Sequence, residues 1–406
     1  MLIDKASIKC HFETYNAKLS FEDSLDIGNL TLSFSLIQIL AISFLISGAA
    51  CLIIILGFSK TTAKSTIRND TSAVQAAHTR PTPRIGGLAI VLGLVVASLI
   101  VFISDTVSTH MALILSALPV FVVGLAEDLG RLASPRNRLL ASAVSGALFI
   151  LLMGQWLPRT DIPVLDLAML WTPFAISLSL FLSVGISHAF NLIDGLNGLA
   201  ATTAVGVALA LALIAHQAGL LEHRNFLFIL SAATVGFLVL NFPFGKIFLG
   251  DAGAYVLGHL LVWASISILW NAPNVTPLAV LLIFFWPIAD TIMAILRRYS
   301  SGKPITQPDR LHFHQLAMRA VEIILLGRNN RKLANPLATI LTLPFVVSPM
   351  IAGVFFAYDP SKAAIACVCF GVTFFITYKV GMWLAPKLRR SYRFPSKGAV
   401  GVAQAD

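Results

Sequence analysis

Apolar residues in this chain form long runs that are separated by short polar segments. We place eleven such runs, at residues 32–57, 86–104, 110–126, 138–154, 173–190, 198–215, 225–241, 254–270, 276–296, 335–357 and 363–385. About 20 consecutive apolar residues cross the hydrocarbon core of a bilayer as a helix, and several of these runs are slightly shorter. The pattern predicts an all-α polytopic membrane protein with about 11 transmembrane helices.

Composition supports the same class. Of the 406 residues, 57% are hydrophobic and 12% are charged, whereas a soluble domain carries about 25% charged residues. The length of the chain therefore belongs to membrane helices rather than to soluble domains. The four cysteines (Cys10, Cys51, Cys367 and Cys369) have no spacing typical of a metal site, and we assign them no role.

The distribution of Lys and Arg predicts the orientation. If the first loop is cytoplasmic, the cytoplasmic loops and the C-terminal tail hold 22 Lys and Arg, and the outer segments hold 6. The positive-inside rule then predicts a periplasmic N-terminus and a cytoplasmic C-terminus. The parts would be a periplasmic segment 1–31 without a cleaved signal, a transmembrane domain 32–385 and a basic tail 386–406. The net charge of +10 is mostly this bias, and it requires no nucleic acid as a partner.

Polar chemistry gathers on the side that is predicted to be cytoplasmic, in loops 58–85, 127–137, 191–197, 242–253 and 297–334. The stretch Asn191–Ala200, NLIDGLNGLA, places Asp194 among amides and glycines between two apolar runs. Glycine lets the backbone approach a phosphate closely, and a carboxylate there can hold a divalent cation. The alternative is a helical hairpin with a polar tip. The outer loop 155–172 holds no comparable cluster.

Acidic and basic residues also end the third run. Glu127 and Asp128 lie at a helix C-terminus, where the helix dipole disfavours acids, and several arginines follow. This order fits metal or proton handling beside a phosphate, although a solvated loop with self-neutralising charges is the alternative. The end of the first loop, HTRPTPRIGG at residues 78–87, is either an edge that faces phosphate or an ordinary basic flank.

Three further features lie on this side. Gly250 and Asp251 open a predicted helix, which suits phosphate and metal binding, although Asp251 could instead be an N-cap. Asp290 lies inside an apolar run, where a carboxylate indicates function unless it pairs with nearby arginines. His312 and His314 are two positions apart, so on a helix they would not share a face. One histidine would then face the site and the other would brace it.

Five polar segments, at 78–87, 127–138, 191–197, 241–253 and 307–315, thus meet on one predicted face. Their carboxylates, glycines, arginines and histidines are typical of metal-assisted phosphoryl transfer. Because this face lies at the boundary of water and lipid, we expect one lipid substrate and one soluble substrate.

Four motifs in this region, PTPRIGG, NLIDGLNGLA, KIFLGDAG and PDRLHFHQL, resemble those of the polyprenyl-phosphate N-acetylhexosamine-1-phosphate transferases, in the same order. The PDR-x-H-x-H form is more similar to the N-acetylglucosamine branch of that family than to the muramoyl-pentapeptide branch. The resemblance implies transfer of N-acetylhexosamine-1-phosphate, with N-acetylglucosamine as the default sugar, from a UDP-sugar to undecaprenyl phosphate, releasing UMP. It also implies Mg²⁺ (or Mn²⁺) as cofactor, a bacterial inner membrane and synthesis of a cell-envelope glycan such as O antigen. A homodimer stays open.

The resemblance further implies roles for individual residues. The catalytic residues would be Glu127, Asp128, Asp194 and Asp251, with Asp251 and Asp194 as metal ligands. Phe248 would stack on uracil, and the histidine segment would hold the phosphates of the sugar nucleotide. The substrate-binding residues would be Arg84, Arg136, Arg138, Asn191, Asn197, Asn241, Phe248, Asp290, Arg310, His312 and His314.

Three positions depart from the family pattern. Glu127 stands in place of a usual Asp, Asn197 in place of a frequent Asp, and Gln315 in place of a frequent third histidine. The longer Glu127 could still reach a metal or a lysine, whereas Asn197 lacks the charge of a metal ligand. We interpret these departures as variation within a branch, because Asp128, Asp194 and Asp251 remain.

Other functions stay open. A transporter would use Asp290 as a relay group, but the paired broken helices of two repeated halves are not evident. A CDP-alcohol phosphotransferase would carry DG-x-x-AR, which is missing after Asp194 and Gly195. An inactive scaffold is a third alternative. For an enzyme, we expect direct attack by the lipid phosphate, which is mostly dianionic at neutral pH, rather than a covalent intermediate on Asp128 or Glu127.

Overall fold

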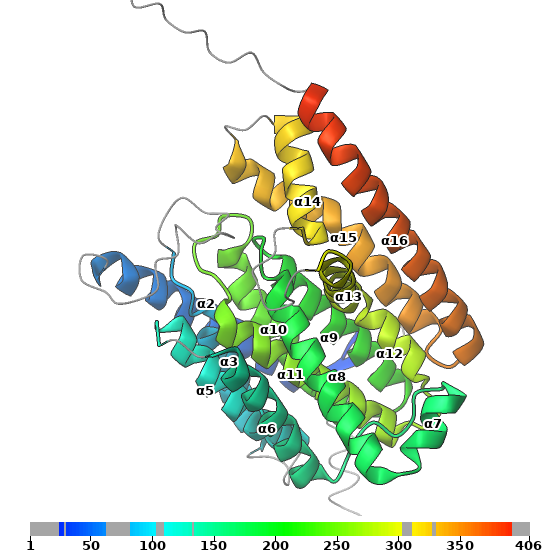
Figure 1. The fold of residues 1–406 in the computed structure, drawn as a ribbon. Coiled ribbons are helices and arrows are strands. Elements are labelled where there is room, and N and C mark those ends of the chain that lie inside the picture. Colours follow the sequence, from blue (N-terminus) through cyan, green and yellow to red (C-terminus); the bar gives the residue numbers. More distant parts are fainter. Residues whose placement is uncertain are drawn as a thin grey trace, which may run out of the picture.

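The computed structural model describes residues 24–27, 30–61, 82–102, 109–131, 134–302, 311–326 and 330–391. Apart from a hairpin of antiparallel strands, β1 (Ser24–Ile27) and β2 (Leu30–Ser33), these residues form helices and turns. The helices are α2 (Phe34–Thr61), α3 (Gly86–Phe102), α4 (Thr109–Ser116), α5 (Leu118–Asp128), α6 (Pro135–Met153), α7 (Pro163–Met169), α8 (Thr172–Ile193), α9 (Leu199–Gln217), α10 (Leu221–Asn241), α11 (Gly250–Asn271), α12 (Pro277–Ile283), α13 (Phe285–Ser300), α14 (Phe313–Ala320), the π-helix η1 (Val321–Leu326), α15 (Arg331–Phe355) and α16 (Pro360–Ser391). Figure 1 shows a bundle in which α14 and α7 lie at opposite ends.

Nine helical segments in the described part of the chain are long and apolar enough to cross a membrane, or ten if α12 and α13 form one bent span. In this count, α4 and α5 together make one span. The second predicted run is α3, whose 17 residues make it shorter than the others. An all-helical multi-pass membrane protein is therefore confirmed, but with nine or ten candidate spans rather than eleven. The direction in which the chain crosses the membrane stays a prediction.

The ninth predicted run, 276–296, is not one straight helix. α12 ends at Ile283 and α13 begins at Phe285, with a bend of 77° between them. Pro287 favours this break, because it has no N–H to donate to the carbonyl of Ile283 and its ring would clash with that carbonyl in a continuous helix. The prediction of a single continuous span is wrong at this place.

The helix α11 lies at the centre of the bundle, and every residue from Gly250 to Leu269 is buried. Its N-terminal turn packs closely against α3 and α5. A Cβ atom on Gly87 would lie 2.2 Å from the backbone nitrogen of Gly253, and one on Gly124 would lie 2.6 Å from the Cα of Ala252. Such small residues allow helix backbones to approach one another in a membrane. The start of α11 is therefore held between α3 and α5 with no room to shift.

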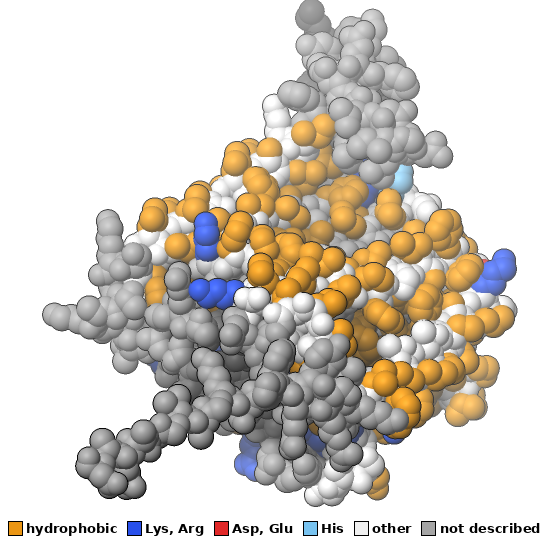
Figure 2. Space-filling view, turned by 90° about the horizontal axis from the view of Figure 1, so that it is seen from above, with side chains coloured by type: hydrophobic (Ala, Val, Ile, Leu, Met, Phe, Trp, Pro, Cys, Tyr) orange, Lys and Arg blue, Asp and Glu red, His pale blue; other side chains and the backbone are white. Residues whose placement is uncertain are grey.

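The acidic residues of interest lie inside the protein. Seen from the end that carries α14, the described surface shows hydrophobic side chains with scattered Lys and Arg and almost no Asp or Glu (Figure 2). Glu127, Asp128 and Asp251 are only 6%, 4% and 9% exposed. Burial of a carboxylate is costly unless hydrogen bonds, cations or ligands compensate for it. The groups that compensate for the burial of these three carboxylates are therefore described below.

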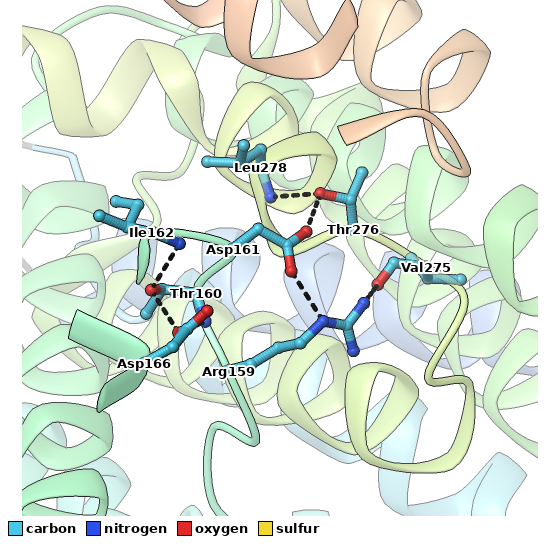
Figure 3. Close-up of polar contacts among 8 residues, drawn as sticks. All are labelled: Arg159, Thr160, Asp161, Ile162, Asp166, Val275, Thr276 and Leu278. Atoms are coloured by element: carbon cyan, nitrogen blue, oxygen red, sulfur yellow. Dashed lines mark hydrogen bonds and ion pairs between the residues drawn. The ribbon is translucent and has the colours of Figure 1, made fainter. Parts of the chain in front are cut away.

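The loop at the opposite end, 155–172, holds a hydrogen-bond network that the sequence did not reveal (Figure 3). Arg159 Nε donates to Asp161 Oδ1 at 2.7 Å, and Arg159 Nη2 donates to the carbonyl of Val275 at 2.9 Å. The hydroxyl of Thr276 donates to Asp161 Oδ2 and accepts from the first turn of α12. The network ties this loop to α12. The expectation that the loop holds no cluster is wrong.

The same loop is ordered by a second carboxylate. Thr160 donates to Asp166 Oδ1 through its N–H at 2.6 Å and through its hydroxyl at 2.7 Å. Between them, Asp161 has a φ of 58°, a left-handed conformation that Asp tolerates better than most residues. These bonds stabilise the turn into α7, and each described carboxylate in the network has a named donor.

Candidate active site

The site is built at the N-terminus of α11. Gly86 N–H and Gly87 N–H donate to the carbonyls of Phe248 and Leu249 at 2.9 and 2.8 Å, which joins the start of α3 to the start of α11. Gly250 has a φ of +76°, and a Cβ there would lie 2.0 Å from the carbonyl oxygen of Arg84. Only glycine fits at this position. The motifs around residues 84 and 250, far apart in sequence, are therefore in contact.

Asp128 caps α11 from the neighbouring helix α5. Its Oδ1 accepts the N–H of Asp251 at 2.8 Å, and its Oδ2 accepts the N–H of Ala252 at 2.9 Å. These are two of the N–H groups that a helix N-terminus leaves without an internal partner. The alternative that Asp251 is an N-cap is wrong, because Leu249 occupies that position and Asp128 supplies the acceptor.

Asp251 and the residues of the α8–α9 turn face one another. Asn191, in the last turn of α8, donates from Nδ2 to Asp251 Oδ1 at 2.6 Å. α8 ends at Ile193, and Asp194 has a non-helical conformation with a φ of −77° and a ψ of 48°. The helix therefore does not continue through Asp194, although that residue still lies close enough to Asp251 for their charges to interact.

Asp194 is the least compensated of these carboxylates. Its carboxylate makes no hydrogen bond or ion pair with the described residues. The side chain of Asp194 is partly exposed to solvent, although protein atoms surround most of it. Burial raises the pKa of Asp194 to about 7, and Asp251 adds to this effect while Arg84 opposes it. A cation would relieve this situation, because it would bind the charged form of the carboxylate.

These residues fit a divalent cation such as Mg²⁺. Asp194 and Asp251 offer carboxylate oxygens, and within the described part of the chain the side chain of Asp251 accepts only the amide of Asn191. Among the described residues, no three His, Cys, Asp or Glu side chains converge as a preformed metal site. Mg²⁺ commonly uses one or two carboxylates and completes its shell with water and substrate phosphates. Asp251 and Asp194 as metal ligands stay a prediction.

Two arginines bring positive charge to the carboxylates. Arg138 Nη1 donates to Glu127 Oε1 at 3.2 Å and lies near Asp251, while Arg84 lies near Asp194 and Asp128. The departure at Glu127 thus provides an acid that reaches an arginine. Arg136, by contrast, is exposed at the start of α6.

Asn197 and Asn241 act as braces in this structure. Asn197 Nδ2 donates to the carbonyl of Pro243 at 3.0 Å, and its N–H donates to Asn335 Oδ1 at 2.8 Å. Asn241 accepts from Gly198 N–H at 2.6 Å and donates to the carbonyl of Ile247 at 2.7 Å. Both amides hold the turn that precedes α11.

Phe248 is half-buried in that turn. Its N–H donates to the carbonyl of Pro83 at 2.8 Å. Substrate contacts of Phe248, Asn197 and Asn241 stay predictions.

Asp290 holds the histidine segment. Its Oδ2 lies 3.0 Å from His312 Nδ1 and 3.5 Å from His314 Nδ1, and its Oδ1 accepts the N–H of Phe313 at 2.9 Å. His314 also abuts the α8–α9 turn, since a Cβ on Gly195 would lie 2.5 Å from His314 Nε2. Burial lowers the pKa of His314, although Asp290 opposes this. Arg310 lies outside the described residues.

The expectation that His312 and His314 point to different faces is wrong. His312 is the N-cap of α14, with a φ of −62° and a ψ of 150°, so it does not follow helical geometry. Both rings therefore turn to Asp290 and stack, with centroids 5.6 Å apart. The segment before them is held by Arg297 Nη1, which donates to the carbonyl of Leu311 at 3.0 Å.

Tyr255 and His188 were not predicted from the sequence to lie at the site. Tyr255 lies four residues after Asp251 and therefore on the same face of α11, a signal that helical spacing could have supplied. The ring of His188, on α8, lies 4.8 Å from the ring of Tyr255.

Comparisons with known proteins agree with this arrangement. Residues 110–269, which span α4 to α11, match the model of glycosyl transferase family 4. The chain is 33% identical over 242 residues to a Bacillus subtilis (strain 168) protein described as "Probable undecaprenyl-phosphate N-acetylglucosaminyl 1-phosphate transferase", covering 59% of this chain and 67% of the relative. It is 30% identical over 349 residues to the decaprenyl-phosphate N-acetylglucosaminephosphotransferase of Mycolicibacterium smegmatis (strain ATCC 700084 / mc(2)155), covering 77% and 80%.

A more distant branch also matches. The chain is 31% identical over 255 residues to the phospho-N-acetylmuramoyl-pentapeptide-transferase of Anoxybacillus flavithermus (strain DSM 21510 / WK1), covering 57% of this chain and 74% of the relative. The matched residues include the carboxylates of α5, of the α8–α9 turn and of α11. This chain therefore belongs to glycosyl transferase family 4, as a polytopic membrane member of the polyprenyl-phosphate sugar-1-phosphate transferases.

Proposed function

We propose that this protein transfers N-acetylhexosamine-1-phosphate, with N-acetylglucosamine as the sugar, from its UDP derivative to undecaprenyl phosphate. The products are the sugar-diphospho-undecaprenol and UMP, and the reaction begins synthesis of a cell-envelope glycan such as O antigen. One observation carries the proposal: carboxylates from α5, from the α8–α9 turn and from α11 meet beside Arg84 and Arg138, and the carboxylate of Asp194 has no hydrogen bond or ion pair among the described residues. Such a site suits an anionic substrate that arrives with a cation.

The reaction is a direct displacement. An oxygen of the lipid phosphate forms a bond to the phosphorus that carries the sugar, and the bond from that phosphorus to the oxygen of UMP breaks. A phosphate monoester has a second pKa of about 6, so at neutral pH the attacking oxygen needs little deprotonation. Arg84 and Arg138 would reduce the repulsion between the two anions and hold them in line. Mg²⁺, when bound, would neutralise charge on the diphosphate as a Lewis acid.

The contacts of Asp128 support this route over a covalent intermediate. Both of its oxygens accept backbone N–H groups of α11, so the carboxylate is held in the cap and its electron pairs are less available for attack on phosphorus. For the same reason, a variant of Asp128 would disturb Asp251 as well, and its loss of activity would not identify a nucleophile. The sharper test uses unaltered protein with labelled UMP and UDP-sugar but no lipid. Exchange of label would establish the covalent route, and its absence supports direct displacement.

We propose the orientation that the charge distribution predicts. Reporter fusions after Gly130 and near Gln307 should be cytoplasmic, and a fusion near Pro158 should be periplasmic. The opposite pattern would contradict the proposal, because UDP-sugars are made in the cytoplasm and Asp194 follows the C-terminus of α8, whereas loop 155–172 precedes the N-terminus of that helix.

One experiment tests the activity itself. The purified protein is incubated with undecaprenyl phosphate, Mg²⁺ and UDP-N-acetylglucosamine, UDP-N-acetylgalactosamine or a UDP-6-deoxy-N-acetylhexosamine, and UMP is measured. Lipid-dependent UMP release with the first sugar is expected. Preference for another sugar would correct the substrate, and no release with any of them would favour an inactive scaffold.

A further inference from the structure

Arg138 contacts several neighbouring side chains, but one of its N–H groups donates to none of the described residues. It lies in the first turn of α6, and its Nη1 donates to Glu127 Oε1 at 3.2 Å. Its Nε is buried and has no hydrogen-bond partner among the residues that the structure describes. A buried N–H without a hydrogen-bond partner costs free energy. A ligand oxygen that accepts from Nε would remove that cost.

Tyr255 approaches the same guanidinium from α11. Its side chain is 2% exposed, and its hydroxyl is close enough to the Arg138 guanidinium for the two groups to interact electrostatically. Because Tyr255 follows Asp251 by one helical turn, the hydroxyl and the Asp251 carboxylate lie on the same face of α11. Arg138 is close enough to Asp251 for their charges to interact.

His188 supports both partners from α8. Its Nε2 lies 3.5 Å from the hydroxyl of Ser142, which itself donates to the backbone carbonyl of Arg138 at 3.0 Å, and the His188 ring lies 4.8 Å from the Tyr255 ring at an angle of 57°. Side chains from four helices thus fix one arginine: Glu127 from α5, Arg138 itself from α6, His188 from α8 and Tyr255 from α11. An arginine that only balanced the charge of Glu127 would not need three neighbours to fix its direction.

We propose that Glu127 and Tyr255 are positioning residues, which hold the Arg138 guanidinium so that its free edge binds phosphate oxygens in the site. The planar guanidinium can bind two oxygens of one phosphate, but only when its plane is correctly oriented. Glu127 fixes one nitrogen and the Tyr255 hydroxyl fixes the plane. The phosphate belongs either to the lipid monophosphate or to the nucleotide diphosphate, and the inference rests on the proposed function.

The test compares Tyr255→Phe with the unaltered protein. The substitution removes one hydroxyl and keeps the ring against His188. We expect the KM for one of the two phosphate substrates to rise about five- to tenfold, with kcat changed by less than about twofold, as for the loss of one hydrogen bond to a charged group. Whether the KM for undecaprenyl phosphate or for the UDP-sugar rises identifies the phosphate. Tyr358→Phe, at a 42% exposed tyrosine between α15 and α16, is the matched control and should leave both KM values unchanged.

A double-variant cycle separates positioning from simple packing. Arg138→Lys keeps the charge but loses the fork, and it should raise the same KM by about tenfold or more. Tyr255→Phe should add almost nothing in the Arg138→Lys background, because the group that it positions is gone. Glu127→Gln should raise the same KM, whereas Glu127→Asp should not restore it, because the side chain is one methylene too short to reach Arg138. Unchanged KM values in Tyr255→Phe, or fully additive effects, would overturn the proposal.

A binding measurement keeps the inference separate from the activity. Inorganic pyrophosphate should raise the Tm of the unaltered protein, and less so that of Tyr255→Phe and Arg138→Lys at matched Mg²⁺. If no UMP is released but this difference holds, the proposed reaction is wrong and the phosphate site stands. If UMP is released and pyrophosphate stabilises all variants equally, the inference is wrong and the function stands.

Discussion

The two ends of the helical bundle treat carboxylates in different ways. At the α7 end, Asp161 is bound by Arg159 and Thr276, and Asp166 accepts two bonds from Thr160. At the α11 N-terminus, the Asp251 side chain accepts one neutral amide from the residues that the structure describes, and the Asp194 carboxylate has no hydrogen bond or ion pair with them. The first arrangement is complete without a ligand, and the second is not.

This difference separates bracing from binding. A buried carboxylate whose partners are all supplied by the protein stabilises the fold and has little to offer a ligand. A buried carboxylate that lacks such partners is costly, and it is retained where a cation or substrate completes it. We therefore expect the same substitution, Asp to Asn, to have different effects on activity and stability at the two ends.

The largest expected effect is that of Asp251→Asn. This variant keeps the size of the side chain but removes the charge that would hold the cation. We expect turnover to fall by about 100-fold or more, with Tm within a few degrees of the unaltered protein. UMP release and a thermal melt in detergent check both values. If the Asp251→Asn variant were fully active, Asp251 would be a bracing carboxylate, and the proposed difference between the two ends would be wrong.

Removal of metal should have an effect of similar size. We expect chelator to abolish UMP release and Mg²⁺ or Mn²⁺ to restore it, because two carboxylates and a diphosphate cannot be brought together without a cation. A thermal melt measured with and without Mg²⁺ should also show that the cation stabilises the unaltered protein but not the Asp251→Asn variant. Full activity in chelator would refute the metal.

Asp290 is an intermediate case, because it is a fully paired carboxylate at the site end. Asp290→Asn should loosen the histidine segment and raise the KM for the UDP-sugar by about tenfold, with a smaller change in kcat. Because His312 acts through the same contact, Asp290→Asn combined with His312→Ala should be no worse than the more severe single variant. Additive losses would show that the histidine and the carboxylate act separately.

The bracing end should respond in stability only. Asp161→Asn removes the ion pair with Arg159 and weakens the bond from Thr276, and we expect a loss of about 1–3 kcal/mol in unfolding free energy. Turnover per folded molecule should not change. A loss of turnover in a variant with unchanged Tm would mean that the α7 end takes part in the reaction.

The smallest effect concerns pH. The pKa of Asp194 is raised to about 7 in the folded protein, above its value of about 3.9 in an unfolded chain. Between these values the folded state binds the extra proton, so this residue makes stability fall as pH rises through 7. In chelator, Asp194→Asn should therefore raise the Tm by about 2 °C at pH 8 and have little effect at pH 4. An equal shift at both pH values would contradict the raised pKa.

Much of the fold was predictable because apolar runs of membrane length are a local signal. Each of the eleven runs corresponds to a helix or a helix pair. The 77° bend at Phe284 was missed, although Pro287 was visible in the sequence. The network around Arg159 was missed because its partners, Val275 and Thr276, lie more than a hundred residues away.

The proximity of the candidate residues was more predictable than their arrangement, and their roles stay predictions. Motif resemblance gathered Asp128, Asp194 and Asp251, and all three lie at the α11 N-terminus. It could not show that Asp128 caps a helix 123 residues further along the chain. Nor could helical spacing place His312 and His314 together, since that rule does not apply to a residue outside the helix. Hydrophobic periodicity does not predict hydrogen bonds between residues that are far apart in the sequence.

The central position of α11 bears on how this protein is made. The helices that pack against it (α3, α4, α5, α6, α8, α9 and α10) all precede it in the chain. A helix that carries Asp251, Tyr255 and His259 leaves the ribosome with polar groups that lipid alone would not satisfy. By then its acceptors and glycine surfaces are already in the membrane. Chain order therefore lets α11, with its buried Asp251, Tyr255 and His259, insert against helices that are already in place, and a chain truncated before residue 250 would contain those helices without α11.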